Sequence, residues 1–167
     1  MTKKQGIKTL LLFLNKKGKI KMLLTGTKNT TTQEVLTDGV INLGFNYRRN
    51  CRRVCGVRTF ENNGNSITLG QQGMYHITAV LVGSGSEAGD VIVQLLENGE
   101  AVDGAFSTQT ITTPETEFRT FVIDYFVLVD CSCVLGNSSI ITKTIALQNT
   151  GVDAIFTTVV LNVEKEN

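Results

Sequence analysis

Apolar and polar residues alternate along several short stretches of the chain, and turn residues separate these stretches. The alternation is clearest at 66–69, 73–83, 91–96, 101–106, 117–130, 140–148 and 154–165, and shorter apolar stretches lie at 22–26, 40–45 and 57–60. Alternation with a period of two is typical of β-strands, and no stretch shows the period of an amphipathic helix. Short strands at regular spacing predict an all-β sandwich or barrel.

The turn residues and the composition support this prediction. Asn98-Gly99 lies between two apolar arms, which is a strong hairpin signal. The chain has sixteen glycines and one proline, and it is rich in Thr, Val and Ile. β-Branched residues fit pleated strands, and glycine and asparagine supply the turns between strands.

The stretch 118–129 is apolar on both faces of the predicted strand. One set of alternate residues is Phe118, Val122, Phe126 and Leu128, and the other is Phe121, Ile123, Tyr125, Val127 and Val129. A two-layer sandwich covers only the inner face of each sheet. The second apolar face therefore needs another cover, for which we favour a partner subunit over the strands of residues 22–60.

Charge is distributed unevenly, although the formal net charge is only +1. Residues 1–22 contain seven lysines and no acidic residue, whereas residues 61–167 contain thirteen acidic residues and three basic ones. Nucleic-acid binding needs clustered cations over the contact surface, so no nucleic-acid partner is expected. No apolar stretch approaches the roughly 20 residues of a membrane-spanning helix, so no membrane partner is expected either.

Residues 1–21 are assigned as a basic arm or a mis-annotated leader, separate from an N-terminal segment at 22–60 and a main domain at 61–167. The apolar stretch at 9–14 is short for a signal peptide, and no cleavage site follows it. KKGKIK, directly before Met22, is what a ribosome-binding site and an A/T-rich spacer would encode. The alternative is an amphipathic arm that docks on a partner or a lipid surface.

Residues 47–60, YRRNCRRVCGVRTF, contain five arginines and two cysteines. Only Tyr47 and Phe60 could stack with bases there, so the stretch is a weak candidate for nucleic-acid binding. A guanidinium group pairs bidentately with carboxylates, which indicates ion pairs with an acidic neighbour. The candidate attachment residues are Arg48, Arg49, Arg52 and Arg53.

Four cysteines supply the number of thiols that a structural zinc site needs. They are Cys51, Cys55, Cys131 and Cys133. The spacings, C-x3-C and C-x-C, differ from those of zinc knuckles. We therefore expect separate buried thiols, with no metal and no cofactor.

Catalytic motifs are absent from the sequence. His76 is the only histidine, and it lies in an apolar stretch where a packed structural imidazole is expected. The sequence contains no nucleophile elbow, phosphate-binding loop, zinc-protease motif or dinucleotide-binding turn. The protein is therefore expected not to be an enzyme.

Three stretches carry a resemblance to a known superfamily. They are NSITLGQQGMYHITAVLV, VQLLENGEAV and IALQNTGVDAIFTTVVLNVEK. In order and spacing they resemble strands of the tumour necrosis factor and complement globular-head superfamily, especially its bacterial and phage members. The resemblance covers residues 60 to 165. Some members of the superfamily have a collagen-like stalk before this domain, and residues 1–59 contain no such repeat.

The resemblance implies a jelly roll of about ten strands that assembles as a tight homotrimer around aromatic residues. For this chain the predicted trimer contacts are Phe121, Tyr125 and Phe156. Members of the bacterial and phage branch sit on spore surfaces, phage tail fibres and capsids. The resulting hypothesis is a virion structural protein, either a capsid decoration or a head- or tail-fibre module, whose partners are phage capsid or fibre proteins. The alternative is a surface or fibre-borne module that binds a glycan or a protein receptor.

Overall fold

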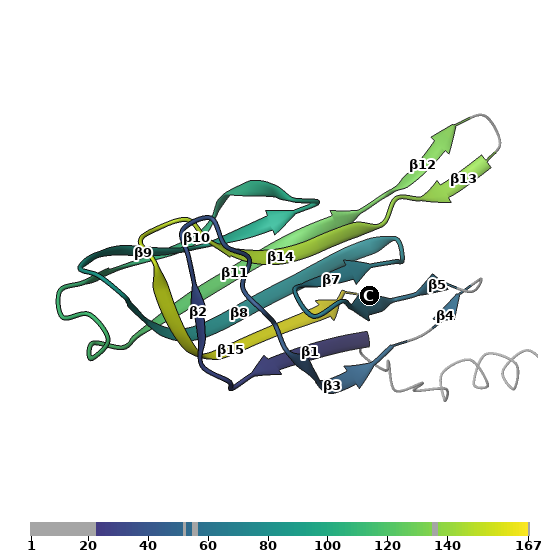
Figure 1. Cartoon of the computed structure of the whole chain (residues 1–167). Coiled ribbons are helices and arrows are strands. Elements are labelled where there is room, and N and C mark those ends of the chain that lie inside the picture. Colours follow the sequence, from purple (N-terminus) through teal and green to yellow (C-terminus); the bar gives the residue numbers. More distant parts are fainter. Residues whose placement is uncertain (1–22, 52, 55–56, 135–136, 167) are drawn as a thin grey trace, which may run out of the picture.

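The computed structural model describes residues 23–51, 53–54, 57–134 and 137–166, and these residues form strands and loops without any helix (Figure 1). Residues 1–21, assigned above as an arm or a leader, lie outside this range. The strands build two antiparallel sheets that pack face to face. The described residues include no helix of the length and apolarity that a membrane span requires.

The first sheet, called the β8 sheet, has five strands in its main path and a short sixth strand beside it. In spatial order these are β11 (Arg119–Val129), β8 (Gly73–Gly85), β15 (Ala154–Lys165), β1 (Leu23–Asn29) and β3 (Phe45–Asn50), and β2 (Gln33–Val35) pairs with β15. β8 pairs with β11 on one side and with β15 on the other, over nearly the full length of each strand.

The second sheet, called the β9 sheet, has five strands. In spatial order these are β10 (Glu100–Ile111), β9 (Gly89–Glu97), β14 (Lys143–Asn149), β7 (Ser66–Leu69) and β6 (Phe60–Asn62). The chain crosses between the two sheets from β7 to β8, from β8 to β9, from β10 to β11 and from β14 to β15. The predicted all-β jelly roll of about ten strands is therefore confirmed.

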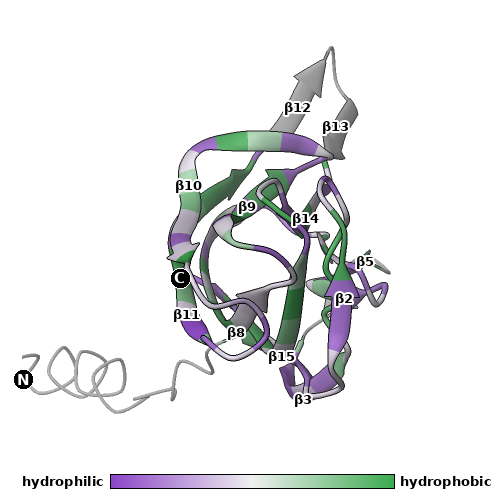
Figure 2. Cartoon of the chain, turned by 60° about the vertical axis from the view of Figure 1, so that its left-hand side comes forward, coloured by the Kyte–Doolittle hydropathy of each residue, from purple (hydrophilic) through white to green (hydrophobic). Residues whose placement is uncertain are grey.

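The two sheets enclose one hydrophobic core, to which strands such as β7 and β8 contribute alternate residues. Figure 2 shows bands of opposite hydropathy along β10, which contributes Ala105 and Ile111 to the core. Inside the core, the rings of Phe121 and Phe156 meet edge to face at 5.9 Å, and those of Phe60 and Tyr75 do so at 5.8 Å. All four side chains are at most 2% exposed. Burial of each such side chain stabilises the fold by about 1.5–3 kcal/mol.

The hairpin predicted at Asn98-Gly99 is present between β9 and β10. Asn98 has φ of 53° and Gly99 has φ of 85°. Positive φ at both central residues defines a type I′ turn, whose twist matches that of the flanking strands. The Asn98 side chain also accepts a hydrogen bond from the Thr144 backbone N–H at 2.9 Å, which ties the turn to β14.

Residues 23–50 belong to the sandwich, which places the predicted attachment segment largely in the same unit as the main domain. β1 lies inside the β8 sheet, between β15 and β3. Ile41 and Leu43 are fully buried in the core. The predicted strand at 40–45 is wrong: Val40 makes one bridge to Gln148, and the next strand begins at Phe45.

Two short ribbons extend from one end of the sandwich (Figure 1). They are β4 (Arg53–Val54) with β5 (Val57–Arg58), and β12 (Cys131–Val134) with β13 (Asn137–Ile140). The first ribbon follows β3 and the second follows β11. The same end holds the start of β1 and the end of β15, since Leu23 is paired with Lys165. The loop between β10 and β11 lies at the opposite end.

Candidate assembly and attachment surfaces

The outward side of the β8 sheet carries exposed apolar side chains. We call it the apolar face, and it consists of Met74, Val80, Val122, Phe126, Leu128 and Val160. Val122, Phe126 and Leu128 are 51–54% exposed, and Met74 is 40% exposed. Several exposed apolar side chains on one side of a sheet are typical of an interaction surface.

Strand register brings the members of the apolar face together. Val122 is paired with Val80, and Val80 is paired with Val160, so three valines form one row across β11, β8 and β15. Leu128 is paired with Met74 near the end of the sheet that bears the ribbons. β1 and β3 extend the same sheet sideways and do not lie over this face. The alternative that the N-terminal strands cover it is therefore wrong.

A polar row crosses the sheet beside the valine row. Asp124 is paired with Thr78, and Thr78 is paired with Asn162. The Tyr47 hydroxyl donates to Asn162 Oδ1 at 2.7 Å. Because Gly26 has no side chain, the Tyr47 ring lies across β1, and a Cβ at Gly26 would come within 2.9 Å of that ring. Polar groups inside an apolar interface determine how the two surfaces align, because each buried polar group needs a hydrogen-bond partner.

His76 lies on the outward side of β8 and is not packed in the core, which corrects the sequence-based expectation. Its ring stacks on the Phe126 ring, with centroids 4.5 Å apart and planes at 12°. Its Nε2 is hydrogen-bonded to Asp124. Among the described hydrogen bonds, none joins the His76 ring to a serine, threonine or cysteine side chain.

Two of the three predicted trimer contacts, Phe121 and Phe156, face the core, while Tyr125 remains a prediction. Phe121 and Phe156 are fully buried inside the sandwich, and Tyr125 is half-buried against the same core. A side chain with no exposure cannot contact a second subunit. The residues that face outward on β11 are those of the other alternating set, such as Val122 and Phe126. The sequence contained both sets but no signal of which one faces inward.

Two of the four candidate attachment arginines are placed on the surface. Arg48 and Arg49 are exposed on β3, which forms one edge of the β8 sheet. Arg49 Nε donates to Cys51 Sγ at 3.2 Å. Arg52 and the side chain of Arg53 lie outside the described residues. Near these arginines, Phe45 is 78% exposed and Leu43 is buried.

The cysteines are described only in part. Cys51 is a free, half-buried thiol at the margin of the core. Cys55 and the side chains of Cys131 and Cys133 lie outside the described residues, so separate buried thiols remain a prediction for them. Within the described ranges, no three His, Cys, Asp or Glu side chains converge on one point as a metal site would require.

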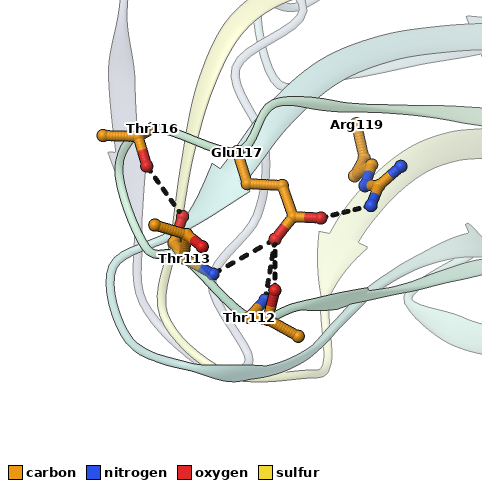
Figure 3. A network of polar contacts seen from close by, with 5 residues as sticks. All are labelled: Thr112, Thr113, Thr116, Glu117 and Arg119. Carbon is orange, nitrogen blue, oxygen red and sulfur yellow. Dashed lines mark hydrogen bonds and ion pairs between the residues drawn. The ribbon is translucent and has the colours of Figure 1, made fainter.

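The loop between β10 and β11 is organised by one carboxylate (Figure 3). Glu117 Oε2 accepts from the Thr112 N–H at 2.8 Å, the Thr113 N–H at 3.1 Å and the Thr112 hydroxyl at 2.9 Å. Arg119 pairs with the other oxygen. These hydrogen bonds, led by those from the two backbone N–H groups, lower the pKa of Glu117 to about 2.

Replacing Glu117 with glutamine should make the fold less sensitive to acid. The folded-state pKa is below the ordinary value of 4.5, so the ionised carboxylate stabilises the fold above about pH 5, and this contribution is lost as pH falls toward 2. Urea midpoints measured from pH 7 to pH 2 should therefore fall less steeply for Glu117→Gln than for the wild type. The control is Glu115→Gln, a change at an exposed residue of the same loop. Equal slopes for Glu117→Gln and the wild type would contradict the prediction.

Comparison with known proteins bears on the fold. No protein-family model matches the sequence. No curated protein matches it. Solved structures do match, each over 87% of this chain. Eiger TNF from S. frugiperda is 11% identical, with 93% of its chain covered and a TM-score of 0.61. Murine APRIL at pH 5.0 is 10% identical, with 100% covered and a TM-score of 0.57.

A third similar structure is PRD1 vertex protein P5, at 14% identity, with 97% of that chain covered and a TM-score of 0.51. The coverage is nearly complete on both sides, so the likeness extends over the whole sandwich. Identities of 10–14% relate the folds and not the activities. The chain thus has a jelly roll of the tumour necrosis factor type.

Proposed function

We propose that this protein is a structural component of a bacteriophage particle and has no enzymatic activity. It assembles as a homotrimer and serves as a capsid decoration or as a head- or tail-fibre module. The observation that carries the proposal is the apolar face, with Val122, Phe126 and Leu128 each about half exposed on one side of an otherwise closed sandwich.

A second copy of the chain is the occupant that the apolar face fits best. Beside its apolar side chains, the face holds Asp124, His76 and Asn162 in defined hydrogen bonds. In a cyclic trimer each copy contacts the next head to tail, so we propose that the apolar face packs against a different surface of the neighbouring copy. The jelly-roll fold and the resemblance of residues 60–165 to trimeric superfamily members support three copies.

The virion assignment rests on two supports. The sequence resembles the bacterial and phage branch of the superfamily, and the fold resembles PRD1 vertex protein P5, which is named for a vertex. Arg48 and Arg49, together with Arg52 and Arg53, are the proposed contacts to a capsid or fibre protein. We expect neither nucleic acid nor membrane among the partners, and we expect assembly in the cytoplasm of the bacterial host.

Mass spectrometry of purified virions tests the location. The protein should be found in the particles, in a copy number that is a multiple of three at each attachment point. Light scattering on the purified protein should give about three times the mass of one chain at micromolar concentration. Absence from virions together with recovery from the culture supernatant would overturn the virion function and favour the receptor- or glycan-binding module.

A further inference from the structure

The two edges of the β8 sheet differ in what covers them. At one edge β11 lies beside β10, and the Ser107 hydroxyl accepts a hydrogen bond from the Val122 N–H at 3.3 Å. At the other edge β3 pairs with β1 on one side only, and no described strand pairs with its outer side. An edge strand presents unpaired N–H and C=O groups that can pair with another extended chain.

Charge around β3 is of one sign. Residues 39–60 contain five arginines and no acidic residue, although the chain as a whole has nearly balanced charge. None of the ion pairs among the described residues includes Arg48 or Arg49. The surface of β3 therefore complements an acidic partner, and its arginines can pair bidentately with carboxylates.

Exposed aromatic side chains flank these charges. Phe45 is 78% exposed and Tyr47 is 46% exposed, and both belong to β3. Recognition by strand addition combines backbone hydrogen bonds along an edge with contacts to side chains beside it. A nucleic acid would use the arginines but could not form a strand ladder with the outer peptide groups of residues 45–49, so the geometry favours a polypeptide.

We propose that β3 binds an extended, acidic polypeptide segment as an added antiparallel or parallel strand of the β8 sheet. Peptide groups of the segment pair with the outer side of β3 along residues 45–49, and its carboxylates pair with Arg48 and Arg49. This inference deepens the attachment part of the proposed function and rests on it, since the segment belongs to the particle protein that holds the trimer.

The test uses the full chain and a defined probe. The probe is a fluorescent peptide of alternating glutamate and valine, six residues long to match β3, with its binding followed by anisotropy at low salt. The matched control probe has the same sequence with N-methylated backbone amides, which cannot donate hydrogen bonds. The parent peptide should bind, and the N-methylated peptide should bind at least about tenfold more weakly.

Two protein variants test the charges. The double variant Arg48→Glu, Arg49→Glu should weaken binding of the parent peptide about tenfold or more, and Arg48→Lys, Arg49→Lys should stay within about fivefold of the wild type. Circular dichroism of both variants checks that the fold is retained. Amide hydrogen exchange should slow in β3 when the peptide is present, which a purely electrostatic contact would not cause.

Each contrary result would overturn a specific part of the inference or of the proposed function. Equal binding of the parent and N-methylated peptides would overturn strand addition. Tighter binding of a single-stranded oligonucleotide than of the peptide, lost in the double glutamate variant, would replace it with a nucleic-acid surface. A trimer found in virions that binds no peptide would overturn this inference and leave the proposed function intact. Strong peptide binding by a monomer absent from virions would support strand addition and overturn the proposed function.

Discussion

Substituting Val122 with aspartate is expected to convert the proposed trimer into a folded monomer. Val122 is 53% exposed in the single chain and is paired with Val80 in the valine row of the apolar face. A carboxylate buried there without a partner costs about 3–5 kcal/mol at each interface. In the monomer the same carboxylate stays in water, so the fold itself should lose little stability.

The measurement is light scattering combined with far-UV circular dichroism. The Val122→Asp variant should have the mass of one chain and the spectrum of the wild type. Val40→Asp provides the matched control, because Val40 is 45% exposed and does not belong to the apolar face; this variant should remain trimeric. A Val122→Asp protein that stays trimeric would exclude the apolar face as the assembly surface, and a monomeric wild type would exclude the trimer.

Several strands were predictable from the sequence alone. β7 coincides with the predicted stretch 66–69, and β15 coincides with 154–165. In β7 the alternation has one cause, namely that Ile67 and Leu69 meet the core while Ser66 and Thr68 do not. The hairpin at Asn98-Gly99 was equally local, because the turn residues themselves determine its positive φ values.

The direction in which β11 faces could not be predicted in this way. Both sets of alternate residues in this strand are apolar, so hydropathy does not distinguish the core side from the assembly side. The choice depends on which set meets the core between the two sheets, which is decided by contacts distant in sequence. The predicted trimer contacts therefore included Phe121 and Phe156 from the core, although the surface residues Val122 and Phe126 had been recognised as apolar.

The place of the edge strand β3 in the sheet could not be predicted either, for a related physical reason. The sequence of β3 is FNYRRN, which shows no regular apolar pattern. An edge strand that is largely exposed to solvent needs few apolar side chains. Its membership in the β8 sheet follows from pairing with β1, which in turn pairs with β15 at the far end of the chain. Pairing between residues so distant in sequence leaves no local pattern, and the N-terminal segment was therefore assigned as a separate unit.

Phe121→Ala should lower the free energy of unfolding far more than Phe126→Ala does. Phe121 has no exposure and meets Phe156 edge to face at 5.9 Å, so the alanine leaves a cavity that costs about 3–5 kcal/mol. Phe126 is 54% exposed and contacts mainly the His76 ring. Its removal from a single chain should cost less than about 1 kcal/mol.

Both substitutions are best measured in the Val122→Asp background, where unfolding involves one chain and does not depend on protein concentration. Urea unfolding then gives the free energy of unfolding for each variant directly. In the wild-type background the order of effects on assembly should reverse, with Phe126→Ala weakening the trimer by removing a contact at the interface. If Phe126→Ala destabilised the monomer as much as Phe121→Ala, the assignment of the two faces of β11 would be wrong, and the valine row would have to belong to the core. The two aromatic residues thus separate folding from assembly on opposite faces of one strand.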